Sequence, residues 1–228
     1  MQNWHAIWNR RQGELGSDAL QSLIELDGFD AGAGRIIAAD WRAYVHLIAQ
    51  RLHLQAGQGV YEVGCGAGAF LYALQELGVH IGGLDYSASL VAKASEVMPD
   101  GDFTHGEAVQ MPLEPVYDVV LANSVFHYFP DQDYAAQVLQ RMLDKATRMV
   151  AILEVPDLAS RDEAERIRRD SLSPSAYEEK YRGLAHFYYD RSWFADFAAQ
   201  RGYHCQVFDQ CIPNYAQSPF RFNCLITK

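Results

Sequence analysis

Short apolar runs rich in β-branched residues alternate with helical patterns from Val60 onward. A strand, a crossover helix and a second strand form a parallel βαβ unit, and repeated units build one sheet. The expected strands, each followed by a Gly, Asp, Asn or Pro that would break it, are Gly59–Val63, Val79–Leu84, Asp102–Thr104, Tyr117–Ala122 and Arg148–Glu154. The alternation predicts an α/β fold with a doubly wound, mostly parallel sheet.

Helical periodicity fills the segments between these strands. The apolar spacing predicts one helix over Ala69–Leu77 and another that opens at Ser87, whose side chain is expected to cap it. Asp131 is expected to cap the helix that follows the fourth strand. Before the first strand, Asp40–Leu52 has an apolar face, and the Gly-rich segment Leu26–Gly34 precedes it.

The last third of the chain has a different pattern. Asp157–Lys180 reads as a charged helical stretch and Ser192–Gln200 as an amphipathic helix. Two β-rich runs, His204–Asp209 and Phe220–Thr227, predict an antiparallel hairpin. The connection between them, Gln210–Pro219, is too long for a tight turn, so we expect it to reach over another part of the protein.

The length of 228 residues suits one domain with a full core. We divide that domain into an N-terminal helical cap or lid (1–55), a ligand-binding core (56–155), a helical insertion that would form a substrate lid (156–190), and a C-terminal helix with the hairpin (191–228).

Composition excludes several classes of partner. The formal charge of −10 would repel a polyanion, so nucleic acid is not an expected partner. The apolar runs are far shorter than the roughly 20 residues that a membrane helix needs, so we expect no membrane and a cytoplasmic location. Neither the cysteines nor the histidines have metal-ligand spacing, so no metal is expected. We expect a monomer or a homodimer.

The segment Glu62–Gly68, with the sequence Glu-Val-Gly-Cys-Gly-Ala-Gly, follows the first strand and opens a helix. Its glycines would let the backbone turn sharply and approach a ligand closely, as in nucleotide-binding folds. Asp85 lies 21 residues after Gly64, at the end of the second strand, where a carboxylate can accept both hydroxyls of a ribose. The alternative is that Asp85 only caps the next helix.

Three segments and one single residue together resemble the class I S-adenosylmethionine (SAM) dependent methyltransferases: Glu62–Gly68, Asp85, Gly106–Pro112 and Tyr117–His127. The resemblance covers residues 60 to about 155 and implies a Rossmann-like fold with SAM as the cofactor. It implies that the glycines hold the methionine and ribose end of SAM, and that Asp85 binds the ribose. Glu107 and Ala108 would lie near the adenine, and Asn123 and Ser124 beside the methionine part. The expected cofactor-binding residues are Trp41, Tyr44, Glu62, Gly64, Cys65, Gly66, Gly68, Asp85, Tyr86, Ser87, Glu107, Ala108, Asn123 and Ser124.

His127 and Tyr128, which follow the fourth strand, are the catalytic candidates. The resemblance implies that they lie nearer the transferred methyl group than Asn123 and Ser124 do. A histidine with its ordinary pKa near 6.5 can take a proton from a hydroxyl or ammonium nucleophile around neutral pH. The equally favoured alternative is that His127 packs beneath the loop. The aromatic residues around Trp4 and Trp8 and around Phe194 and Phe197 are interpreted mainly as core. Only His186, Tyr188 and Tyr189 are considered able to reach a substrate.

The resemblance implies transfer of a methyl group from SAM to an oxygen or nitrogen atom of a small molecule by in-line displacement, with release of S-adenosylhomocysteine. One alternative is an NAD(P)-dependent oxidoreductase, which shares the glycine turn and the acidic residue; the sequence lacks the Tyr-x-x-x-Lys pattern of one such group. A second alternative is a SAM-binding module without catalysis. The sequence does not identify the methyl acceptor.

Overall fold

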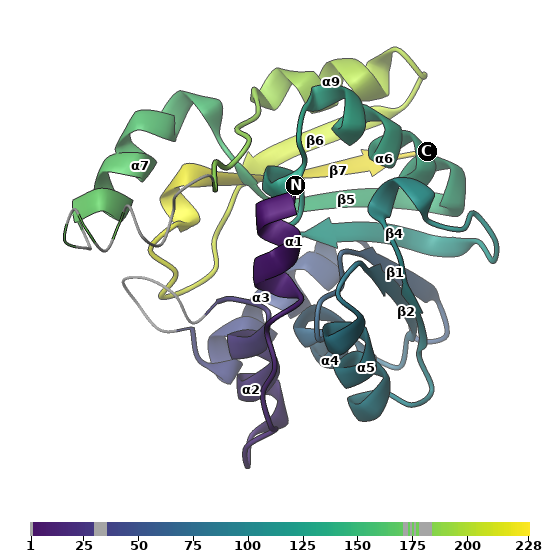
Figure 1. The fold of residues 1–228 in the computed structure, drawn as a ribbon. Helices are drawn as coiled ribbons and strands as arrows, with labels where there is room; N and C mark the ends of the chain where they lie inside the picture. The colour runs from purple at the N-terminus through teal and green to yellow at the C-terminus, as the bar shows by residue number, and fades with distance from the viewer. Residues whose placement is uncertain (1, 30–35, 171–172, 174, 176, 178–183) are drawn as a thin grey trace.

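The computed structural model describes residues 2–29, 36–170, 173, 175, 177 and 184–228. Within this part of the chain, seven strands form one sheet in the order β3-β2-β1-β4-β5-β7-β6 (Figure 1). The strands are β1 (Gly59–Val63), β2 (His80–Asp85), β3 (Asp102–His105), β4 (Tyr117–Asn123), β5 (Ala146–Pro156), β6 (His204–Asp209) and β7 (Arg221–Thr227). The first five pair in parallel, whereas β7 is antiparallel to both β5 and β6. This confirms the mostly parallel, Rossmann-like sheet and its antiparallel C-terminal hairpin.

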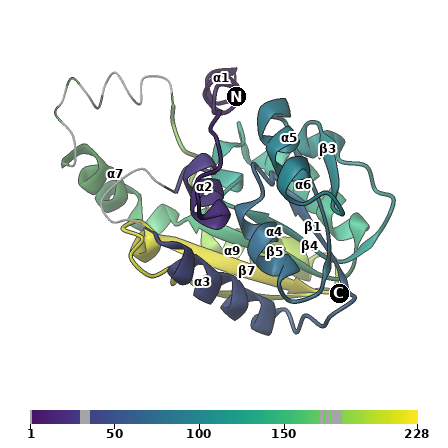
Figure 2. The same cartoon turned by 90° about the horizontal axis from the view of Figure 1, so that it is seen from below.

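Helices cover both faces of the sheet. One face carries α2 (Ala19–Leu26), α3 (Ala38–Arg51), α4 (Ala69–Gln75) and α5 (Ala88–Val97), and Figure 2 shows α2, α3 and α4 grouped there. The other face carries α6 (Gln132–Lys145) and α9 (Arg191–Ala199). Neighbouring strand residues serve opposite cores, since Val60 packs with the first set and Tyr61 with the second. Burial on both faces explains why the central strands read as continuous apolar runs.

Two helices lie outside these layers. The N-terminal helix α1 (Gln2–Trp8) lies beside the carboxyl end of β4, and α7 (Arg161–Asp170) follows β5 (Figure 1). The charged stretch predicted for Asp157–Lys180 therefore contains a helix, but residues 171–172, 174, 176 and 178–183 lie outside the described part. The same holds for residues 30–35 of the Gly-rich segment. No helix in the described part of the chain has the length and apolar character needed to cross a membrane.

The two predicted helix caps had different outcomes. Asp131 caps α6 as expected, because its Oδ1 accepts a hydrogen bond from the amide of Tyr134 at 2.8 Å. The prediction for Ser87 is wrong: within the described residues its side chain caps no amide of α5. Its hydroxyl instead donates to the carbonyl of Trp8 at 3.2 Å. A contact with the N-terminal helix has thus replaced the local capping bond.

Candidate functional site

A cavity lies at the carboxyl ends of the parallel strands, where open α/β sheets bind their ligands. Most of the residues expected to contact a cofactor line it: Trp41, Glu62, Gly64, Cys65, Gly66, Asp85, Tyr86, Glu107, Ala108, Asn123 and Ser124. Tyr128 lines it as well. Tyr44, Gly68, Ser87 and His127 are not among the described residues that line the cavity.

The turn between β1 and α4 requires glycine at three positions. Gly64, Gly66 and Gly68 have φ angles of 73°, 54° and 91°, a left-handed region that other residues enter only at a cost. A Cβ atom on Gly66 would overlap the carboxylate of Asp27. Gly64 and Gly66 therefore present backbone to the cavity.

Asp85 joins the end of β2 to this turn. Its Oδ2 accepts from the amide of Gly66 at 2.9 Å, and its Oδ1 accepts from the amide of Ser87 at 2.8 Å. The carboxylate is 7% exposed and lines the cavity. Asp85 thus holds the glycine turn and the start of α5 while also lining the cavity.

Asp27, which the sequence analysis did not select, belongs to the same site. It follows the last residue of α2, and its two oxygens accept from the amides of Ala67 at 2.6 Å and Ala69 at 2.9 Å. These are amides at the beginning of α4, where a negative charge is favoured. The N-terminal segment therefore holds the glycine turn through one carboxylate. Asp27 and Ala67 are 40 residues apart, so no local pattern connects them.

Three carboxylates, those of Asp27, Glu62 and Asp85, face one cavity. Glu62 and Asp85 are buried, and Asp27 is partly exposed. Burial is the largest cause of raised pKa values in all three, and their mutual repulsion adds to it for Asp27 and Glu62. The pKa of Asp27 rises to about 7, and that of Glu62 rises well above its usual value. Glu62 Oε2 has no hydrogen-bond partner among the described residues. Such a site is suited to a cation, which would relieve the repulsion and stabilise the ionised carboxylates.

The N-terminal helix α1 closes one side of the cavity. Trp4, His5 and Trp8 line it. Trp8 also packs against the hydrophobic core as expected, so its ring contributes to both the core and the cavity wall. The His5 ring stacks on Tyr86 at a centroid distance of 4.2 Å, and its Nε2 lies 3.6 Å from Glu107 Oε1. Phe194 and Phe197, in contrast, are buried in the core as expected.

The end of β4 connects the cavity to a buried hydrogen-bond chain. Asn123 lines the cavity, and its Oδ1 accepts from the hydroxyl of Tyr44 at 3.2 Å. That hydroxyl in turn accepts from Gln210 Nε2 at 3.2 Å. Ser124 has a φ of 61°, which is uncommon for a residue with a side chain and is frequent at functional sites. Tyr44 thus supports Asn123 from behind.

His127 lies in the short 3₁₀ turn Phe126–Tyr128 and is buried. Its burial, together with nearby His186 and Arg221, lowers its pKa well below the usual value. The ring is therefore neutral at pH 7, and the expectation of an ordinary pKa does not hold. Tyr128 packs on it at a centroid distance of 4.0 Å and lines the cavity with its own ring.

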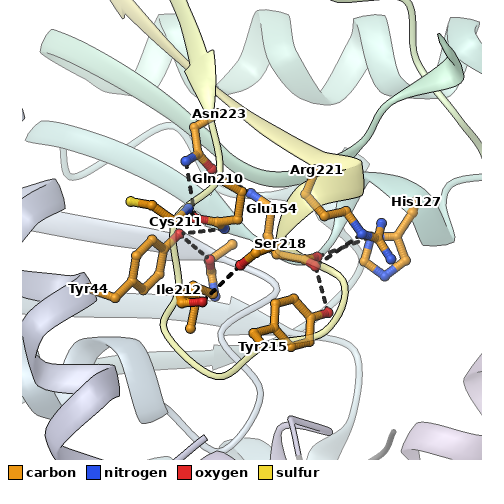
Figure 3. Close-up of polar contacts among 11 residues, drawn as sticks. Tyr44, His127, Glu154, Gln210, Cys211, Ile212, Tyr215, Ser218, Arg221 and Asn223 are labelled. Carbon is orange, nitrogen blue, oxygen red and sulfur yellow. Dashed lines mark hydrogen bonds and ion pairs between the residues drawn. The ribbon is translucent and has the colours of Figure 1, made fainter. Parts of the chain in front are cut away.

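A second polar cluster, which the sequence analysis also missed, surrounds Glu154 (Figure 3). Glu154 Oε1 accepts from the hydroxyl of Tyr215 at 2.7 Å and lies 3.2 Å from Arg221 Nε. Its backbone has a φ of 60° at an irregularity in the pairing of β5 with β7, and its amide donates to Asn223 Oδ1 at 2.8 Å. The long connection between β6 and β7 does reach over other elements, because it carries Tyr215 to Glu154.

Comparison with known proteins agrees with this geometry. Residues 61–149 match a family described as a methyltransferase domain. A "probable S-adenosylmethionine-dependent methyltransferase" of Mycolicibacterium smegmatis is 32% identical over 117 residues, which cover 50% of this chain and 46% of that protein. A Nocardia farcinica protein named uroporphyrinogen decarboxylase is 35% identical over 109 residues, covering 46% of this chain but 27% of that one.

Among solved structures, magnesium protoporphyrin IX methyltransferase from Synechocystis PCC 6803 with bound S-adenosylhomocysteine has a TM-score of 0.64 at 16% identity. The match covers 99% of this chain and 94% of that one, and at this identity it shows the fold. The chain spans less than half the length of the two curated relatives described above. The family match and the fold agree: residues 61–149 of this chain belong to a methyltransferase domain, and a relative that matches half of the chain is named as SAM-dependent.

Proposed function

We propose that this protein transfers a methyl group from SAM to an oxygen or nitrogen atom of a small molecule and releases S-adenosylhomocysteine. The observation that carries the proposal is the cavity in which the glycine turn of a methyltransferase domain meets the carboxylates of Asp27, Glu62 and Asp85. A cytoplasmic location, a monomeric or homodimeric state and the division into cap, core, insertion and hairpin stay predictions.

The residues present fit SAM. Its sulfonium and ammonium groups would complement Asp27, Glu62 and Asp85, and the unpartnered Glu62 Oε2 is a ready acceptor for an ammonium group. In the proposed arrangement Asp85 also takes the ribose, whereas Glu107 and Ala108 lie at the adenine. When bound, SAM supplies a methyl group that is already activated on sulfur and needs no acid to leave.

The contribution of this chain to the reaction is then mainly alignment and the exclusion of water. Trp4, Trp8 and Trp41 form apolar walls around the polar groups of the cavity. Holding two reactants in line can supply roughly 7–11 kcal/mol of the barrier. We propose that the N-terminal segment acts as a lid, because α1 reaches both Tyr86 and Glu107.

The same carboxylates weigh against an NAD(P)-dependent oxidoreductase. A dinucleotide brings a pyrophosphate with negative charge to the glycine turn, where Asp27 already occupies amides of α4. Titration calorimetry with SAM and with NADH separates the two functions, and only SAM should bind. A non-catalytic SAM-binding module would bind SAM but would form no S-adenosylhomocysteine with any small-molecule acceptor.

Replacing Asp85 by alanine should weaken SAM binding by about tenfold or more. Hydrogen bonds to a charged group are worth roughly 1.5–3 kcal/mol each, and about 1.4 kcal/mol is tenfold in affinity. Calorimetry on the folded variant measures this change. Binding within a factor of about two of the parent protein would remove the ribose contact from the proposal.

Binding of SAM near pH 7 should release a proton from Asp27. Its pKa of about 7 means that about half of the molecules carry the protonated form at that pH, and a bound cation favours the ionised form. SAM affinity should therefore rise with pH up to about 7 and then level off, and Asp27→Asn should lose this component. Calorimetry in buffers of different ionisation enthalpy measures the released protons. Asp131→Asn, which alters the exposed cap of α6, is the matched control and should behave like the parent protein. Equal proton release in all three proteins would contradict the placement of Asp27.

A further inference from the structure

Several buried polar atoms near the cavity lack partners. Glu154 Oε2, His127 Nδ1, Arg221 Nη1, His186 Nδ1 and the Tyr188 hydroxyl have no hydrogen-bond partner among the residues that the structure describes. Buried polar groups are almost always hydrogen-bonded, because leaving them unpaired is costly. Three of these atoms belong to Glu154, His127 and Arg221, which lie side by side, and this indicates that a further molecule completes the cluster.

The distance between two of these atoms defines what could fit. His127 Nδ1 lies 4.0 Å from Glu154 Oε2, which is too long for a direct hydrogen bond. One oxygen or nitrogen atom placed between them would lie within hydrogen-bond distance of both. In Figure 3 the side chains of His127 and Arg221 converge on the Glu154 carboxylate. Arg221 uses Nε for Glu154 Oε1, which leaves Nη1 for a second oxygen.

The backbone fixes this carboxylate in an unusual position. A positive φ at a residue such as Glu154 persists only where its surroundings hold it, and here Asn223, Tyr215 and Arg221 do so. The cluster is also close to the cavity. Leu153, the residue before Glu154, accepts a hydrogen bond from the amide of Ser124, which lines the cavity. Tyr128 contacts His127 on one side and the cavity on the other.

The charges of the cluster favour an anionic oxygen beside a protic group. Burial, and to a smaller extent Arg221 and Arg168, lower the pKa values of His127 and His186, so the imidazoles are neutral while the two guanidinium groups supply positive charge. Glu154 balances one guanidinium through its ion pair with Arg221. A bound hydroxyl could then donate to Glu154 Oε2, and a carboxylate beside it could accept from Arg221.

We propose that His127, Glu154 and Arg221 form the subsite for a methyl acceptor of the hydroxycarboxylic acid class. The acceptor hydroxyl lies between His127 Nδ1 and Glu154 Oε2, and the carboxylate of the same molecule binds Arg221 Nη1. As the hydroxyl oxygen bonds to the methyl carbon and the carbon–sulfur bond breaks toward sulfur, the hydroxyl proton passes to Glu154 or His127. This assignment rests on the proposed function and specifies its acceptor.

The smallest probe of this chemistry is glycolate, which has one hydroxyl beside one carboxylate. Acetate lacks the hydroxyl and ethanol lacks the carboxylate, so the three form a matched set. Histidine ring signals are recorded by proton–carbon correlation on protein saturated with S-adenosylhomocysteine, and the His127 signal is assigned with His127→Gln. Glycolate should shift that signal saturably. Acetate should bind about fivefold or more weakly, because one hydrogen bond is lost, and ethanol should have no effect.

The double variant Glu154→Gln/Arg221→Gln should lose glycolate binding. It removes both charges together, so no buried charge is left without its partner. Arg148→Gln is the matched control, since Arg148 lies on the same strand β5 near its other end and contacts Leu52. It should keep the glycolate shift.

The subsite is overturned if glycolate, acetate and ethanol give equal shifts or none, or if the double variant binds glycolate like the parent protein. The cluster would then hold only structural water. Calorimetry with SAM on the same samples keeps the two proposals distinct. Normal SAM binding without a glycolate response removes the subsite alone, whereas absent SAM binding removes the proposed function.

Discussion

Replacing Gly66 by alanine should lower SAM affinity by more than about 100-fold. The backbone at Gly66 has a φ of 54°, and the new Cβ would overlap the Asp27 carboxylate. Asp27 would have to move and give up its bonds to the amides of Ala67 and Ala69. Hydrogen bonds to a charged group are worth roughly 1.5–3 kcal/mol each, so the turn would lose its bound shape together with its carboxylate. Calorimetry measures the affinity, and a thermal melt checks the fold.

Gly202→Ala is the matched control for backbone strain. Gly202 has a φ of 76°, and a Cβ there would meet nothing within 4 Å. Both variants therefore pay a similar cost for the left-handed backbone, about 1–2 kcal/mol. Gly202→Ala should lose stability yet bind SAM normally. A folded Gly66→Ala protein that binds SAM as well as Gly202→Ala does would contradict the role of the turn.

The sheet could be predicted because the pattern that marks each strand lies within the strand and the turn residues next to it. The central strands are buried on both faces by the helices around them, which makes each one a short apolar run between turn residues. The strands over Gly59–Val63 and His204–Asp209 were predicted with the bounds that the structure gives. β5 extends two residues beyond the prediction at each end, because Ala146 pairs with Tyr117 and Pro156 with Arg221. Pairing between distant segments sets such ends.

The cavity was predictable only where its residues belong to contiguous motifs. Glu62–Gly68, Asp85, Glu107 and Asn123 each lie at or just after a strand end, so the topology brings them to one edge. Whether the motif residues have the cofactor contacts assigned to them stays a prediction. The N-terminal wall could not be found in this way, because the positions of Trp4 and Trp8 depend on contacts with Tyr128.

The acidic and basic residues that were missed share a physical reason. The structural roles of Asp27, Glu154 and Arg221 depend on partners far along the chain. In the sequence alone, each of them resembles a charged surface residue. The folded chain buries Glu154 and Arg221 together although 67 positions separate them. A charge at the end of an apolar strand is the one signal that could have selected Glu154, since a buried position there needs a partner.

Replacing Arg221 by glutamine should destabilise the fold by about 3–5 kcal/mol, the usual cost of leaving a buried charge without its partner. The side chains of Arg221 and Glu154 are 4% and 0% exposed, so water cannot replace the lost guanidinium. In the variant, Tyr215 would be the main hydrogen-bond donor left to the Glu154 carboxylate. Urea unfolding at pH 7 measures the change in the free energy of unfolding from the shift of the midpoint at constant slope.

The double variant Glu154→Gln/Arg221→Gln should recover most of this loss, because two neutral amides replace the ion pair and leave no uncompensated charge. If the single and double variants are equally unstable, the lost free energy of unfolding comes from the packing of the Arg221 guanidinium group and not from its charge. If the single variant loses less than about 1 kcal/mol, the pair behaves like an exposed salt bridge. A double variant that regains stability but still fails to bind glycolate would separate the two roles of the pair, since the charges would then be needed for the acceptor and not for the fold.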